Sequence, residues 1–234
     1  MSPLTDSQQH GARLSELLGL AHPPVAVAFL PEPPPGVSRV AASAPAGCSY
    51  WRRATAGEVF YTEAADHLGC TIGAHTHNVT MPPEKAAELQ SMVGTMVGLG
   101  YLAMAEVPGL PRRAEAFGVA VYAPAAKTPC PPDVVLVRGG ARQMMLLAEA
   151  AHAAGIGHEG ATLGRPACAM IPAALAAGRA NTSLGCVGNR VCTGLGDDEL
   201  YVTIPGARLG DVVEALATIV RANEELERFH RARL

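Results

Sequence analysis

Several features that would point to a common class of protein are missing from this chain of 234 residues. Aromatic residues make up only 4% of it and charged residues 17%, and a net charge of -3 offers no basic face for nucleic acid. The longest uncharged run, 89–105, contains three glycines and is too short to span a bilayer comfortably. The first residues lack the basic and apolar regions of a secretory signal. We therefore expect a cytoplasmic protein that binds neither nucleic acid nor membrane.

The cysteines also lack the close pairs of zinc ribbons and ferredoxins. The chain has six cysteines, and the closest two, Cys186 and Cys192, are separated by five residues. A metal site would therefore have to be assembled from distant segments. In a reducing compartment, dispersed cysteines are more often metal ligands, catalytic groups or buried apolar residues than disulfides.

What the chain does have is enough apolar sequence, 49%, for one well-buried core. Amphipathic patterns predict helices over about 5–20, 48–56, 82–98, 140–154, 167–177 and 207–231, with a loop or broken helix over 66–78. Apolar runs predict strands over 24–30, 58–62, 117–122, 134–137 and 200–204. Interleaved strands and helices indicate an α/β or α+β fold with a mixed β-sheet flanked by helices. We expect a single compact domain, 1–234, with a subdomain joint near 155–164 before a cysteine-bearing C-terminal half.

Four cysteines share one local context, the entrance to a short helix beside Gly, Pro, Arg or His. They are Cys48, Cys70, Cys168 and Cys186. A helix N-terminus presents unpaired N–H groups and a positive dipole end, and both favour a thiolate over a thiol. Thiolates bind soft metals and attack electrophiles, so this set indicates a metallocluster or a thiol-based site.

Three histidines flank Cys70 within eleven residues. His67 precedes the cysteine by three residues and is placed to donate to its sulfur or to replace a thiolate. The spacing of His75 and His77 occurs in some zinc and copper sites. For these two we favour a polar loop with solvated imidazoles.

Segments 47–52, 58–73, 132–138 with 143–145, 164–168 and 183–200 resemble the prokaryotic family catalogued as domain of unknown function 169. The resemblance covers about 11–229 and is most specific over 164–205. It implies that the cysteines at 48, 70, 168 and 186 form a set, which does not include Cys130 or Cys192. The family name implies no reaction, but a shared set implies a cofactor site rather than unrelated core thiols.

We expect these four cysteines to hold a [4Fe–4S] cluster, which needs four soft anionic ligands. Such a cluster is negatively charged, so we expect nearby cations and backbone amides to stabilise it. The expected neighbours are Arg52, Arg165 and Arg190 as cations, Gly69, Gly185 and Gly188 as points of close amide approach, and His67 as a reserve ligand. The role would be electron transfer, redox sensing or a scaffold for a second cofactor such as haem. The partner would be a redox protein or a small molecule, and the chain is compatible with a homo-oligomer.

Two alternatives remain open. A thiol-dependent enzyme or small-molecule binding protein would use Cys168 or Cys186 as a reactive thiolate and Arg165 or Arg190 as an anion anchor. A structural zinc protein is the less favoured alternative, because structural zinc motifs usually supply their ligands in close pairs.

Overall fold

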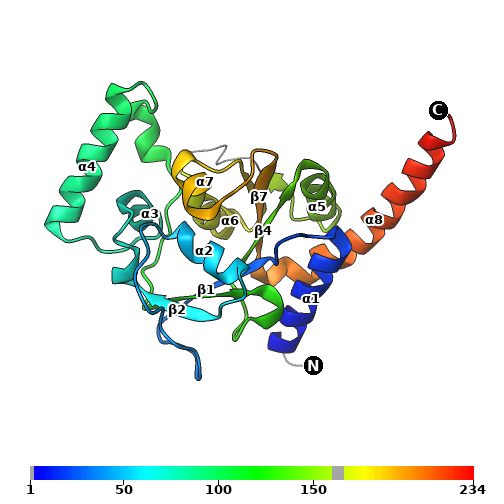
Figure 1. The fold of residues 1–234 in the computed structure, drawn as a ribbon, viewed down its shortest axis with the longest axis horizontal. Coiled ribbons are helices and arrows are strands. Elements are labelled where there is room, and N and C mark those ends of the chain that lie inside the picture. The colour runs from blue at the N-terminus through cyan, green and yellow to red at the C-terminus, as the bar shows by residue number, and fades with distance from the viewer. Residues whose placement is uncertain (1–2, 160–165) are drawn as a thin grey trace.

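A seven-stranded sheet runs through the computed structural model, which describes residues 3–159 and 166–234 (Figure 1). Its strands are β1 (Val25–Leu30), β2 (Phe60–Glu63), β3 (Val119–Pro124), β4 (Val134–Gly140), β5 (His158–Glu159), β6 (Ala180–Ser183) and β7 (Glu199–Pro205). Their order across the sheet is β2-β3-β1-β4-β7-β6-β5. Every neighbouring pair is antiparallel except β5 and β6, which are parallel. The mixed sheet expected from the sequence is confirmed.

Helices cover both faces of this sheet. They are α1 (Pro3–Leu18), α2 (Cys48–Thr55), α3 (Thr71–Thr76), α4 (Pro83–Gly98), α5 (Ala141–Ala153), α6 (Met170–Ala177), α7 (Val187–Thr193) and α8 (Leu209–Arg231). Short 3-10 turns are η1 (Ala64–His67), η2 (Met104–Gly109), η3 (Ala125–Lys127), η4 (Ala167–Ala169) and η5 (Gly206–Arg208).

Successive residues of the central strands point to opposite faces and so contribute to two separate cores. On one face, Val135 and Val137 of β4 pack with α1, α5 and α8. On the other, Val134 and Leu136 pack with α2 and α6. A strand buried on both faces has a continuous apolar sequence, which is why the strand at 134–137 could be predicted.

Two elements carry no apolar pattern: strand β6 was not predicted, and only the start of helix α7 was, from the context of Cys186. Strand β6 has the polar sequence Ala-Asn-Thr-Ser, yet all four residues are buried, because the strand lies inside the sheet between β5 and β7 and helix α6 packs against it. Helix α7 is only seven residues long, too short to show a helical period. Strand β4 also extends beyond its predicted end at 137 through Gly139 and Gly140, because these glycines pair with Leu200 and Glu199 of β7.

The expected joint near 155–164, part of which lies outside the described residues, does not separate two sheets. Strand β7 follows that segment in the chain but pairs with β4, which precedes it, over seven residues. The sheet is therefore shared by both halves of the chain.

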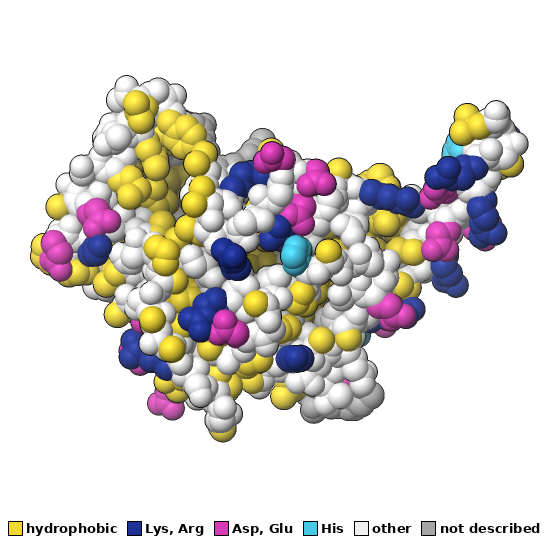
Figure 2. Space-filling model, viewed as in Figure 1, with side chains coloured by type: hydrophobic (Ala, Val, Ile, Leu, Met, Phe, Trp, Pro, Cys, Tyr) yellow, Lys and Arg dark blue, Asp and Glu magenta, His cyan; other side chains and the backbone are white. Residues whose placement is uncertain are grey.

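One segment stands away from this body. Helix α4 and the residues after it, 83–109, form a projection that we call the arm (Figure 1). No residue of α4 is buried, and α3 is the element that it contacts most. Figure 2 shows hydrophobic side chains gathered on the arm beside a hollow. Among the helices described, none has the length and apolar character needed to cross a membrane.

Candidate functional site

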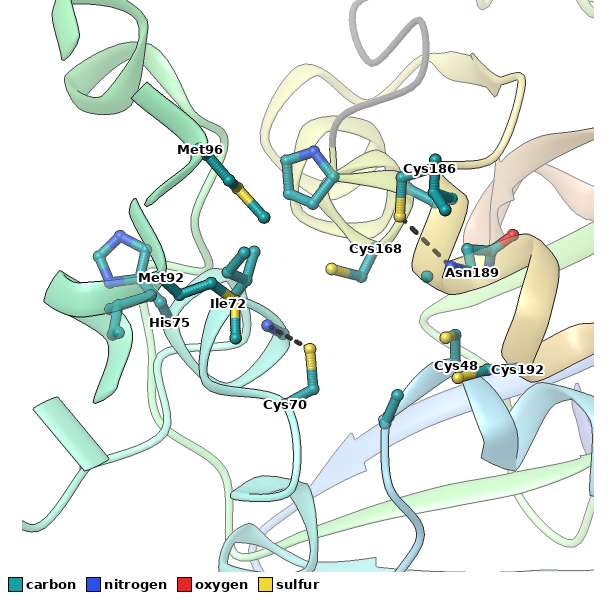
Figure 3. A pocket seen from close by; sticks show the side chains of 18 of the residues that line it. Cys48, Cys70, Ile72, His75, Met92, Met96, Cys168, Cys186, Asn189 and Cys192 are labelled. Carbon is teal, nitrogen blue, oxygen red and sulfur yellow. Dashed lines mark hydrogen bonds between the residues drawn. The ribbon is translucent and has the colours of Figure 1, made fainter. Parts of the chain in front are cut away.

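Five cysteines line one cavity of about 470 Å³ between the arm and the body of the protein (Figure 3). Cys48 begins α2, Cys70 and Cys186 immediately precede α3 and α7, Cys168 lies in η4, and Cys192 lies within α7. The structure therefore brings together the four cysteines expected to meet. It draws them from both halves of the chain, not from a C-terminal half alone.

Three of these sulfurs accept a hydrogen bond from the protein. The N–H groups of Gly73 and Asn189 donate to the Sγ atoms of Cys70 and Cys186 at 3.5 and 3.4 Å, drawn as dashed lines in Figure 3. Both cysteines are thus the N-caps of their helices. The Thr76 hydroxyl donates to the Sγ of Cys168 at 3.3 Å. These donors would also stabilise the sulfurs as thiolates.

Burial nevertheless raises the pKa of three of the thiols, Cys48, Cys70 and Cys168, and brings that of Cys168 to about 12. Neighbouring cysteines raise these pKa values further, because ionised sulfurs would repel one another across the cavity. From the sequence, we expected the position of these cysteines at helix entrances to favour the thiolate form. In these three cysteines the loss of solvation outweighs the N–H groups.

The thiols surround the cavity without converging on one point. Among the described residues, no three His, Cys, Asp or Glu side chains are arranged to hold a single metal ion. A mononuclear zinc site needs four ligands within about 2.3 Å of one ion. In a cubane each cysteine binds a different iron, so its ligands are spaced further apart around the cluster.

Cys192 is the member of this set that sequence reasoning set aside. Its sulfur lies beside that of Cys48, and the two would interact electrostatically if ionised (Figure 3). The available signal was its short separation from Cys186, which places both at the same short helix.

Three arginines were expected beside the cysteines. The two that the structure describes do not line the cavity. Arg52 is exposed and lines a different pocket, with Arg138 and Tyr201. The guanidinium of Arg190 donates to the carbonyl oxygens of Leu184 and Gly196 at 2.6 and 2.8 Å, so it holds the turns on either side of α7. Arg165 lies outside the described residues. The described lining of the cavity includes no Lys, Arg, Asp or Glu.

The expected glycines differ in their roles. Gly69 and Gly188 line the cavity. A Cβ on Gly69 would lie 2.6 Å from the Ala44 carbonyl oxygen, so packing against that loop requires glycine there. Gly185 has φ of +76° and a Cβ there would lie 2.7 Å from Leu195, so its glycine serves the turn before α7.

The histidines are arranged differently from our expectation. His67 is buried, its Nε2 is 2.8 Å from the Thr62 hydroxyl, and it is not among the described residues lining the cavity. His75 and His77 do line it. The expected solvated loop is wrong for His77, which is only 4% exposed, and burial lowers its pKa to about 4. The polar, aperiodic sequence around it concealed this burial.

Comparison with known families shows which family the chain belongs to. The model of the family described as uncharacterised ArCR, domain of unknown function 169, matches residues 13–215. The chain belongs to this family. All five cavity cysteines fall within the matched range. No curated protein and no solved structure matches the chain.

In this member of the family, a buried carboxylate holds the loops that carry Cys48 and Cys70. Asp66 accepts hydrogen bonds from Arg39, from the Ser43 hydroxyl at 2.7 Å and from the Glu63 N–H at 2.8 Å. Its own carbonyl accepts the Tyr50 hydroxyl at 2.8 Å, which ties α2 to η1. Burial alone would raise the pKa of Asp66, but these hydrogen bonds outweigh it and hold the pKa below its ordinary value.

We expect Asp66→Asn to destabilise the protein by about 2 kcal/mol at pH 7, because the amide cannot accept all these bonds. A carboxyl with a lowered pKa stabilises the fold above its unfolded-state pKa, and that contribution is lost as the pH falls through the folded-state value. The difference from wild type should therefore shrink below about pH 4. Urea unfolding at pH 7 and pH 3 measures it, with exposed Glu32→Gln as the control. An equal difference at both pH values would contradict the ionic role.

Proposed function

We propose that this protein binds a [4Fe–4S] cluster through Cys48, Cys70, Cys168 and Cys186 and acts as an electron carrier or redox sensor. The observation that carries the proposal is the gathering of five cysteines from distant segments around one cavity. Unrelated core thiols have no physical reason to collect around one cavity.

The donor set fits such a cluster. Four thiolates are the ligands that a cubane requires, and N–H or O–H donors already face three of the sulfurs. As free thiols these cysteines are costly to ionise, since burial and mutual repulsion raise the pKa values of Cys48, Cys70 and Cys168. A cationic metal centre removes that repulsion, so the site favours metal-bound thiolates over free ones.

When bound, the cluster would supply one-electron transfer at a potential tuned by these hydrogen bonds and by burial. The protein's own part is to orient the sulfurs and to keep a largely apolar wall around them. Cys192, next to Cys48, is the alternative fourth ligand.

The alternative of a thiol-dependent enzyme is less well supported by the geometry. A reactive cysteine needs a lowered pKa, whereas burial raises that of Cys168 to about 12. Arg190, the expected anion anchor, already donates to two backbone carbonyls. A second cofactor such as haem stays a prediction: His75 and His77 would offer imidazole ligands, but the described lining has no cation for haem carboxylates.

Anaerobic reconstitution of the full chain with iron and sulfide tests the proposal. We expect a brown protein with broad visible absorption and about four irons and four sulfides per chain. Alkylation of the cysteines with iodoacetamide should be slow in the reconstituted protein. A colourless protein whose cavity cysteines all react freely would overturn the proposal. If the protein instead contains one zinc per chain and no sulfide, the structural zinc alternative would take the place of the cluster proposal.

A further inference from the structure

One proposed ligand lacks the hydrogen bond that the other three accept. N–H or O–H groups donate to the sulfurs of Cys70, Cys168 and Cys186. Over residues 3–159 and 166–234, no group donates a well-formed hydrogen bond to the sulfur of Cys48. A thiolate at Cys48 would therefore be the least stabilised of the four unless another donor reaches it.

The nearest candidate donor is the side chain of Asn189, on α7. Helix α7 packs against α2, and Asn189 lines the cavity between Cys186 and Cys48 (Figure 3). Its backbone N–H donates to the Sγ of Cys186 at 3.4 Å. Burial raises the pKa of the Cys48 thiol, and the side-chain amide of Asn189 lies close enough to this sulfur to oppose that rise. One residue thus reaches two proposed ligands that are far apart in the sequence.

This amide is buried and unpaired. Asn189 is only 1% exposed, and neither its Nδ2 nor its Oδ1 has a hydrogen-bond partner while Cys48 is a free cysteine. Most buried polar atoms are paired, because an unpaired one has lost its bonds to water without replacement. A neutral thiol is a weak acceptor, whereas an ionised sulfur is a stronger one. A cluster bound through Cys48 would give the amide the acceptor that it lacks.

The turn before α7 fixes which end of the amide meets the sulfur. Oδ1 lies against Gly185, where an added Cβ would come within 3.0 Å of it. The Asn189 carbonyl accepts the Thr193 hydroxyl at 2.8 Å, which anchors the backbone of the same residue. Only the N–H end of an amide favours a thiolate, so Nδ2 is the end that lies at Cys48.

We propose that Asn189 is the positioning residue for Cys48, and that its side-chain amide donates to this sulfur in the cluster-bound protein and raises the reduction potential of the cluster. The inference rests on the proposed function. Hydrogen bonds to the sulfurs stabilise the reduced, more negative cluster more than the oxidised one, so an added donor makes reduction easier. Asparagine supplies this donor without adding charge to a wall whose described residues include no Lys, Arg, Asp or Glu.

Potentiometric titration of the reconstituted full chain tests the proposal, with dithionite as the reductant and redox dyes as mediators. Asn189→Leu nearly preserves the size of the side chain and keeps the backbone N–H that donates to Cys186, but it removes the amide. We expect about four irons per chain and a one-electron reduction equilibrium shifted about 10-fold toward the oxidised cluster, a fall of about 59 mV. Val191→Leu, at an exposed position of the same helix, should leave the potential unchanged.

A second variant covers the case in which leucine does not fit. Asn189→Ala removes the same amide without a new side chain to accommodate, and its potential should also fall. Wild-type potentials in the folded variants would overturn the proposal, as would folded variants that bind no iron, because Asn189 would then serve assembly and not tuning. If the wild-type chain assembles no cluster, the proposed function fails and this inference fails with it. A wild-type cluster with unchanged potentials in the variants overturns this inference alone.

Discussion

Replacing Cys168 with serine should prevent assembly of a complete cluster, so that reconstituted protein retains three or fewer irons per chain instead of about four. Serine nearly preserves the shape of the side chain, and the new hydroxyl can still accept the bond that Thr76 donates to the sulfur. The fold should therefore persist while the soft, anionic ligand is lost. Iron and sulfide assays with the visible absorption spectrum measure the effect.

The chain offers a matched control in its sixth cysteine. Cys130 is also half-buried but packs against β1 and β3, and it does not line the cavity. Cys130→Ser should leave the iron content unchanged. Cys192→Ser shows whether Cys48 or Cys192 is the fourth ligand. It should lower the iron content only if Cys192 binds the cluster in place of Cys48. Full iron content in Cys48→Ser, Cys70→Ser, Cys168→Ser and Cys186→Ser alike would contradict the assigned ligand set.

Gly69→Ala should destabilise the protein by about 2–3 kcal/mol and impair cluster assembly at the same time. The added methyl would lie 2.6 Å from the Ala44 carbonyl oxygen and 3.1 Å from that of Pro45, and backbone atoms cannot give way as a flexible side chain can. Relief requires the loop before Cys70 to move away from the loop before Cys48. Urea unfolding gives the stability change, and iron assay gives the effect on the site.

Gly188→Ala is the matched control, since it too adds one methyl at the cavity wall. No atom lies within 4 Å of a Cβ at Gly188, which sits inside α7. Alanine there should be neutral or stabilising by up to about 1 kcal/mol, because it restricts the unfolded chain and favours helix. Equal losses of stability and of iron content in the two variants would show that any added methyl disturbs the cavity. The packing argument for Gly69 would then fail.

The elements that the sequence could predict are those whose burial leaves a periodic trace. The apolar strand at 134–137 and the long helix ending at Arg231 are examples, and both are present. Strand β6 left no such trace, because its sequence is polar. Helix α7 is too short to show a helical period, and only the capping context of Cys186 predicted its start. Helix α4 was recognised as a helix, but its pattern is the same whether its apolar face meets a core or a cavity.

Residue identities and local context alone determined which cysteines stand at helix entrances, and the structure agrees that Cys70 and Cys186 cap their helices. They also determined the family, through segments spread along the chain. Only the tertiary structure decided that Cys192 joins the set, that Arg52 and Arg190 are directed elsewhere, and that His77 is buried at the cavity. The reason is physical. Local sequence governs caps and periods through neighbouring backbone groups, whereas solvation, pKa and shared walls depend on contacts between distant segments that only the folded chain creates.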